Sequence, residues 1–185
     1  EVGGKLDRKD ASVLVGDAPA VELSYGDATD LYRINLGWAK SKDELTKGFL
    51  LELERGTWAK SSAVAKDAES ATQDGTYKRV VPFVKDTKNA LVMRFVPTPS
   101  LPEMAALQAI FKQAIQLEFQ LESREMSCEA MPHKAERHEI LFYESSEGGA
   151  GVLRQIAEDP DTFPRLARRA LEAMHFDPDT LEDLA

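Results

Sequence analysis

The segment Pro97-Thr98-Pro99 divides this sequence into two stretches whose apolar residues recur with different periods. Before the segment, short apolar runs alternate with polar residues and end at glycine, a pattern typical of β-strands. After it, apolar residues return at helical spacing. The sequence therefore predicts an α+β fold, with a β-rich half at residues 1–99 followed by a helix-strand-strand-helix-helix half at residues 100–185.

The β-rich half contains several apolar runs of strand length. These runs lie at residues 12–15, 21–25, 31–36, 49–53, 80–84 and 90–96. Gly26-Asp27 and the polar segment 86–89 are predicted to be turns between neighbouring strands. Residues 60–76 are small and polar, so they are predicted to form a surface excursion.

Capping residues mark the helices of the second half. Ser100 and Glu103 have the spacing of a capping box, ahead of a long helix that extends to Leu121. A strand is predicted at residues 139–143, and a glycine-rich turn leads from it into a short helix. Asp161 is predicted to cap the last helix.

Composition restricts the class of protein. The chain has 185 residues, of which 43% are hydrophobic and 30% charged, so it can bury a core. Its single cysteine, Cys128, excludes an internal disulfide framework and is typical of a reducing cytosol. No run approaches the roughly 20 apolar residues of a membrane helix. We therefore expect a cytoplasmic protein with no membrane partner, and the missing initiator Met favours a piece of a longer protein.

Charge is distributed unevenly along the chain. Residues 1–98 carry 15 Lys/Arg and 15 Asp/Glu, whereas residues 99–185 carry 8 and 17, which accounts for the whole net charge of −9. Because an acidic surface repels phosphate, any contact with DNA is expected from the first half. The candidates are Arg33, Trp38, Lys40, Lys42, Lys78, Arg79 and Lys88. Trp38 and Trp58 could stack on bases, although buried tryptophans at strand ends are the commoner case.

Motifs of common catalytic chemistry are missing from the sequence. It contains no G-x-x-x-x-G-K-[ST] loop, no G-x-S-x-G elbow and no H-E-x-x-H helix. The chain alone is therefore not expected to be an ATPase, an α/β-hydrolase or a zincin. No catalytic residue is assigned, and whether the chain is an enzyme stays open.

The most distinctive segment is the glycine-rich turn. Gly148, Gly149 and Gly151 can supply positive φ or close packing in a tight strand-to-helix turn, which is the interpretation we favour. Backbone amides at the helix start could instead bind an anion, although Glu144 and Glu147 would repel it. The two carboxylates could also hold a divalent metal, as in a nuclease-like enzyme.

Cys128, His133 and His138 are zinc ligands by residue type. The set lacks a fourth ligand and the paired spacing of structural zinc sites. A polar hairpin with two exposed histidines is the interpretation we favour, so no metal ligand is assigned in this chain.

Several of these segments together resemble the DUF1998 domain. The resemblance spans most of residues 30–178 and is most specific at Asn89-Ala90-Leu91 and at Gly148-Gly149-Ala150-Gly151. The segments that carry it are Tyr32–Trp38, Gly48-Phe49, Gly56–Trp58, Val81–Leu91, Leu107–Gln116, Glu147–Leu153 and Ala170–Pro178.

This resemblance implies a non-catalytic accessory domain. The DUF1998 domain is similar to the C-terminal region of superfamily 2 DEAD/DEAH-type helicases, which act in DNA repair (the MrfA type) or in anti-phage systems such as DISARM and Druantia. The expected partners are then a helicase core, in the same or another chain, and DNA, contacted mostly indirectly. ATP and magnesium would be bound by the parent helicase.

The resemblance also bears on zinc. The family often carries a four-cysteine zinc cluster, whose cysteines are expected after residues 176–178. This chain has only Cys128, so zinc is expected in a larger parent protein rather than among these residues. Two alternatives to the accessory domain are an acidic protein–protein adaptor and a metal-dependent nuclease-like domain that uses Glu144 and Glu147.

Overall fold

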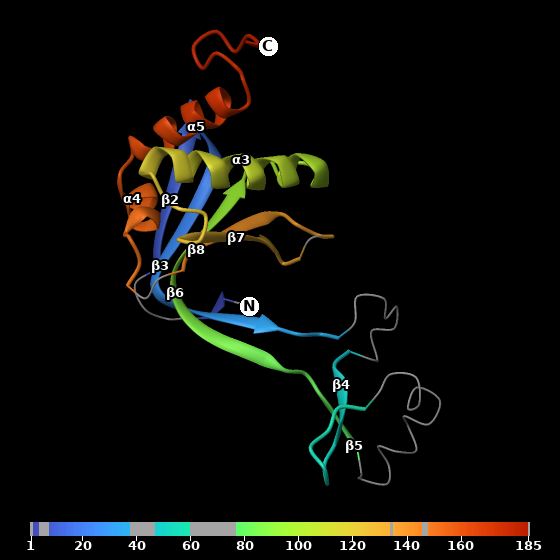
Figure 1. Ribbon diagram of the computed structural model, residues 1–185. Coiled ribbons are helices and arrows are strands. Elements are labelled where there is room, and N and C mark those ends of the chain that lie inside the picture. Colours follow the sequence, from blue (N-terminus) through green and yellow to red (C-terminus); the bar gives the residue numbers. More distant parts are fainter. Residues whose placement is uncertain are drawn as a thin grey trace. The chain divides into compact units, whose positions relative to one another are not determined.

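The computed structural model describes residues 2–3, 8–37, 47–59, 77–133, 135–145 and 148–184 (Figure 1). Its internal contacts divide the chain into two compact units. Unit 1 comprises residues 1–31 and 86–185, and unit 2 comprises residues 32–85. The predicted halves, 1–99 and 100–185, are defined by the periodicity of apolar residues, whereas the two units are defined by contacts. The boundary at residue 99 therefore stays a prediction.

A β-sheet forms the centre of unit 1. Its strands follow the order β1-β3-β6-β8-β7, and β2 pairs with β3 beside this path. The strands are β1 (Val2–Gly3), β2 (Arg8–Val15), β3 (Ala18–Ile34), β6 (Phe83–Phe95), β7 (Met126–Met131) and β8 (Glu139–Glu144). The pairs β1–β3, β2–β3, β6–β8 and β7–β8 are antiparallel. One face of such a sheet must be covered to bury its apolar residues.

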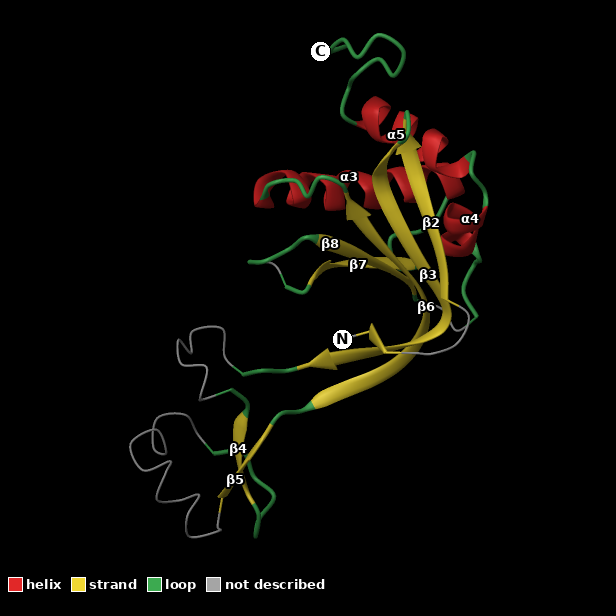
Figure 2. Cartoon of the chain, turned by 180° about the vertical axis from the view of Figure 1, so that it is seen from behind, coloured by secondary structure: helices red, strands yellow, loops and turns green. Residues whose placement is uncertain are grey.

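Three helices cover one face of this sheet (Figure 2). They are α3 (Leu101–Phe119), α4 (Val152–Glu158) and α5 (Thr162–Ala173). Alternate strand residues and the apolar helix stripes meet in one core. It comprises Val21, Leu23, Tyr25, Leu91, Met93, Met104, Ile110, Phe111, Ala114, Ile115, Met126, Ile140, Phe142, Val152, Leu153, Ile156, Phe163, Leu166 and Ala170. The predicted α+β class and the helix-strand-strand-helix-helix order are confirmed.

Two predicted turns are wrong, because each lies inside a strand. Gly26-Asp27 falls within β3, and residues 86–89 fall within β6. Polar residues at these positions make contacts between strands instead of reversing the chain. The Ala28 amide, for example, donates to Asn89 Oδ1 over 3.1 Å. The polar composition that suggested turns therefore reflects an interstrand network.

Helix capping follows the prediction at α3 but not at α5. The Ser100 amide and Oγ donate to Glu103 Oε2 over 2.8 and 2.6 Å, which confirms the capping box. Asp161 stands at the N-cap of α5 without a side-chain capping bond. Asp159 instead accepts from the Asp161 amide at 3.0 Å and from the Thr162 hydroxyl at 2.7 Å. The carboxylate at the start of α5 therefore comes two residues earlier than predicted.

Unit 2 contains a small antiparallel sheet. In it β4 (Phe49–Glu52) pairs with β5 (Tyr77–Val80). The predicted excursion at residues 60–76 lies outside the described residues. Within the described part of the chain, no helix has both the length and the apolar content to cross a bilayer.

Candidate functional site

The glycine-rich turn is built around a buried carboxylate. Glu144 ends β8 and is only 2% exposed. Its Oε1 accepts from the Val152 amide at 2.9 Å and from the Leu153 amide at 3.3 Å. These amides belong to the first turn of α4 and have no acceptor within the helix. Glu144 therefore occupies the place that an external anion would take at this helix start.

Asn89 ties the same carboxylate to two other segments. Its Nδ2 donates to Glu144 Oε2 over 3.1 Å and to the Gly148 carbonyl over 3.2 Å. Its Oδ1 accepts from the Ala28 amide. One amide side chain thus joins β3, β8 and the turn, and the orientation of its oxygen and nitrogen is fixed by these partners.

Gly149 lies against this carboxylate with no space for a side chain. A Cβ there would lie 1.6 Å from Glu144 Oε2 and 2.7 Å from Asn89 Nδ2, and the φ of +61° already disfavours other residues. Gly148 and Gly151 also have positive φ, of +83° and +74°, but a Cβ on either would meet no heavy atom within 4 Å. Close approach therefore requires glycine at position 149 alone, whereas backbone conformation favours it at all three.

The alternatives in which the turn binds an anion or a metal ion are not supported by the position of Glu144, because its carboxylate is already bound within the fold. Both of its oxygens accept hydrogen bonds inside the fold, and Glu147 lies outside the described residues. The described residues also contain no group of three or more His, Cys, Asp or Glu side chains that could hold a metal ion. The geometry of Glu144 favours a structural role, and the roles of the turn residues stay predictions.

The candidates for DNA contact that the structure describes belong to both units. Lys88 is 15% exposed in unit 1, where its Nζ donates to the Ser145 carbonyl over 2.6 Å. Arg33 is exposed and Arg79 is half-buried, and both belong to unit 2. The other predicted positions, Trp38, Lys40 and Lys42, lie outside the described residues. Lys88 thus stabilises the end of β8, a role that the sequence did not indicate.

A buried tyrosine of β3, Tyr25, is linked to α4 through Asp27 and Arg154. The Tyr25 hydroxyl donates to Asp27, and Arg154 of α4 binds the same carboxylate. The Arg154 guanidinium also lies 6.0 Å from the centre of the Tyr25 ring. Burial raises the pKa of Tyr25 to about 12, and the hydrogen bond from Tyr25 lowers the pKa of Asp27. The sequence does not indicate this contact, because the dipeptide Gly26-Asp27 is typical of a turn.

Stability is expected to fall with alkaline pH because of Tyr25. The unfolded chain releases this proton near pH 10, whereas the folded chain keeps it until about pH 12. Between these values the unfolded state binds fewer protons, so the free energy of unfolding decreases as the pH rises. Urea denaturation from pH 9 to pH 12 should show this loss in the wild type and less of it in Tyr25→Phe.

A second tyrosine provides the control. Tyr143→Phe, at a half-buried position of β8, removes a hydroxyl without touching the Asp27 contact. Its slope of stability against pH is the reference for the loss of a tyrosine hydroxyl other than that of Tyr25. Identical slopes for all three proteins would show that Tyr25 does not hold its proton more tightly in the folded state.

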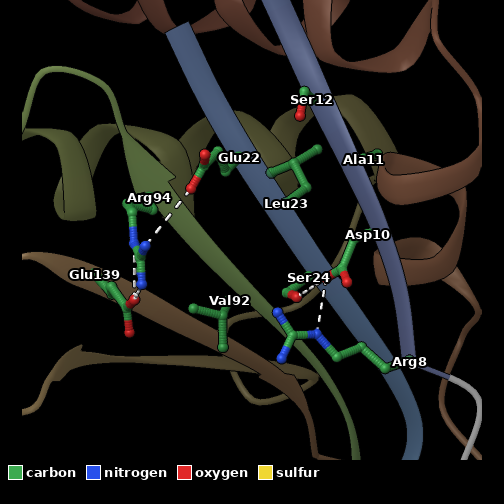
Figure 3. Close-up of a pocket in the computed structure, with 10 residues that line it drawn as sticks. All are labelled: Arg8, Asp10, Ala11, Ser12, Glu22, Leu23, Ser24, Val92, Arg94 and Glu139. Carbon is green, nitrogen blue, oxygen red and sulfur yellow. Dashed lines mark hydrogen bonds and ion pairs between the residues drawn. The ribbon is translucent and has the colours of Figure 1, made fainter. Parts of the chain in front are cut away.

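A separate pocket of about 290 Å³ crosses β2, β3, β6 and β8 (Figure 3). Its lining residues are Arg8, Asp10, Ala11, Ser12, Glu22, Leu23, Ser24, Val92, Arg94 and Glu139. Arg94 Nε donates to Glu139 Oε1 over 2.9 Å, and Arg8 Nε donates to Asp10 Oδ1 over 2.8 Å. Glu139 raises the pKa of Arg94, and the Ser24 hydroxyl lowers that of Asp10. The pocket holds mutually paired charges, and the Ser24 hydroxyl donates to the Asp10 carboxylate.

Comparison with known proteins identifies the second half of the chain. Residues 107–177 match the family model of the MrfA Zn-binding domain. Among solved structures, the crystal structure of the DUF1998 helicase MrfA bound to DNA is similar, with a TM-score of 0.46 and 7% sequence identity. That alignment covers 100% of this chain and 23% of the helicase chain. A search of curated proteins found no significant match.

The residues of this chain do not fit the zinc site that the family description implies. Structural zinc needs four Cys or His ligands, and the sequence has one cysteine. Cys128 is half-buried, with its Sγ 3.6 Å from Gln108 Nε2. His133 Nε2 lies 3.4 Å from Glu136 Oε2, and His138 Nδ1 lies 3.0 Å from the Glu136 carbonyl. These contacts describe a polar hairpin rather than a ligand set.

The matched segment runs from the middle of α3 to just beyond α5. It therefore includes both strands and both short helices of the second half, together with the glycine-rich turn and Glu144. Residues 107–177 are thus similar to a helicase-associated domain, and this similarity supports the DUF1998-type resemblance that the sequence predicted.

Proposed function

We propose that this chain is a non-catalytic accessory domain of an ATP-dependent DNA helicase or translocase that acts in DNA repair or anti-phage defence. The observation that supports it is the match of residues 107–177 to the MrfA Zn-binding domain. The chain spans only 23% of the length of the DUF1998 helicase to which it is similar, so the activity of a whole helicase is part of the proposal.

The partner in this proposal is a helicase core, in the same or another cytoplasmic chain. Phosphoryl transfer needs a phosphate-binding loop and a magnesium-binding carboxylate, and this sequence has no P-loop. The core would bind ATP and magnesium, and a zinc cluster would belong to the larger protein.

The charge of the two units supports mostly indirect contact with DNA. Unit 1 contains 13 Lys/Arg and 25 Asp/Glu, whereas unit 2 contains 10 and 7. Unit 1 therefore repels phosphate and is suited to a protein partner. Unit 2, with a net charge of +3, is the part of the chain suited to nucleic acid.

Ion pairs join two helices of the matched segment. Glu118 of α3 accepts from Arg165 Nε at 3.1 Å through Oε1 and from Arg169 Nε at 3.1 Å through Oε2. Glu118 is only 17% exposed in these pairs, which limits screening by water. The two arginines of α5 thus link this helix to α3.

Measuring ATP hydrolysis tests the proposed function. The protein encoded by the complete reading frame, with any chain that co-purifies with it, should hydrolyse ATP in a DNA-dependent manner. Residues 1–185 alone should show no turnover above a buffer blank, because the residues that bind phosphate and magnesium are absent. Turnover by this segment alone, or no ATPase in the complete protein and its partners, would overturn the proposal.

A further inference from the structure

In unit 2, the segment at residues 57–59 lies along the β4–β5 sheet. Beyond the β4–β5 pair, the Ala59 amide donates to the Leu50 carbonyl over 2.9 Å, and the Glu52 amide donates to the Thr57 carbonyl over 2.9 Å. Residues 57–59 therefore run antiparallel to β4 on the side away from β5. Leu51 lies opposite both Trp58 and Lys78 in this arrangement.

Directly opposed residues of antiparallel strands share a face of the sheet. Trp58, Leu51 and Lys78 therefore form one row across β4, β5 and the bridged segment. Phe49 lies on the same face, two residues before Leu51. The ring centres of Phe49 and Trp58 are 5.7 Å apart in an edge-to-face contact. We call these four residues the Trp58 face.

The Trp58 face leaves its largest aromatic side chain in solvent. Trp58 is 55% exposed, so the interpretation of a buried strand-end tryptophan is wrong for this residue. The Phe49 ring supports the indole from one edge, which restricts its movement without covering it. An exposed tryptophan that shares a face with a lysine, with Leu51 between them, provides a surface for a flat partner that carries negative charge.

We propose that the Trp58 face stacks the bases of single-stranded nucleic acid, with Lys78 contacting the backbone phosphate. The proposal rests on the proposed function and names the part of the domain that contacts DNA. Unit 2 is basic within an acidic chain, so its charge complements phosphate. A base offers its π-face only when it is unstacked from its neighbours, which is the state of a single strand.

Binding of a short oligothymidylate by the 185-residue chain tests this proposal. Fluorescence anisotropy of the labelled strand should give an affinity that Trp58→Ala weakens by about 5- to 100-fold, whereas Trp58→Phe keeps most of it. Leu53→Ala is the matched control, because Leu53 is an apolar side chain of unit 2 that is 53% exposed. This control should bind like the wild type.

Two further measurements separate stacking from charge. An abasic strand of the same length has the phosphates but no bases, so it should bind the wild type as weakly as oligothymidylate binds Trp58→Ala. Lys78→Ala should lower the slope of log affinity against log salt by about one unit. The abasic comparison uses only wild-type protein and therefore does not depend on the folding of a variant.

Three results would overturn the Trp58 face as a stacking site. They are no binding of oligothymidylate by the wild type, equal binding of abasic and thymidylate strands, and equal affinity of the wild type and Trp58→Ala. A fourth such result is capture of an apolar peptide, instead of the strand, by this face. If one of these results is found but the complete protein has a DNA-dependent ATPase, the stacking site is wrong and the accessory function still holds. If the strand binds through Trp58 but no ATPase is found, the accessory function is wrong and the stacking site still holds.

Discussion

Replacing Gly149 with Ala is expected to lower the free energy of unfolding by about 3 kcal/mol. The new Cβ would lie 1.6 Å from Glu144 Oε2, so either the turn or the carboxylate must move. Movement of Glu144 weakens its bonds to the amides of α4, and the φ of +61° adds backbone strain. Urea denaturation of the wild type and the variant measures the difference.

Gly16→Ala separates strain from collision. Gly16 has a φ of +63°, nearly that of Gly149, and a Cβ there would meet no heavy atom within 4 Å. This control is expected to lose only about 1 kcal/mol, the cost of a left-handed backbone for alanine. If both variants lose the same amount, the contact between Gly149 and Glu144 does not contribute, and the glycine is explained by φ alone.

Replacing Glu144 with Ala is expected to cost about 3 kcal/mol as well, for a different reason. The change removes the acceptor of the Val152 and Leu153 amides and of Asn89 Nδ2, and it leaves these donors unpaired next to the core. Urea denaturation again gives the loss. Circular dichroism should show that the fold is retained at low denaturant.

Glu144→Gln refines this prediction. In one orientation the NH2 group of the glutamine would face the amides of α4, and in the other it would face Asn89 Nδ2, so a donor meets a donor in both. The Asn89 side chain cannot simply rotate, because its Oδ1 accepts from the Ala28 amide. We expect about half the loss of the alanine variant. Glu129→Ala, an exposed glutamate of β7, should change stability by less than about 0.5 kcal/mol. Equal urea midpoints for the Glu144 and Glu129 variants would contradict a stabilising role of the buried carboxylate.

Local patterns predicted the elements that local interactions define. The long helix follows from its apolar spacing, and its start follows from Ser100 and Glu103, three residues apart. Sequence pattern failed where a residue's partner is distant in the chain. Asn89 binds Glu144 from 55 positions away, so its polarity indicated a turn rather than a place within β6.

The candidate site shows the same limit. The glycines marked the turn after β8, but nothing in its sequence indicated that the carboxylate of Glu144 would supply the anion for α4. The exposed face of Trp58 could not be predicted either, because the strand pairing that aligns it with Lys78 spans residues far apart in sequence. A tryptophan after Gly-Thr is compatible with burial or exposure until its neighbours are known.

The interior of the family-matched segment is completed from outside that segment. Residues 107–177 share one core with Leu23 of β3 and with Leu91 and Met93 of β6, and Asn89 closes the hydrogen bonds of Glu144. A polypeptide cut at the limits of the match would expose this apolar surface to water, and Glu144 would lose the hydrogen bond that Asn89 donates to its Oε2. The limits of sequence similarity are therefore not the limits of an independently folding unit, and evolution could exchange this segment between proteins only together with the strands that precede it.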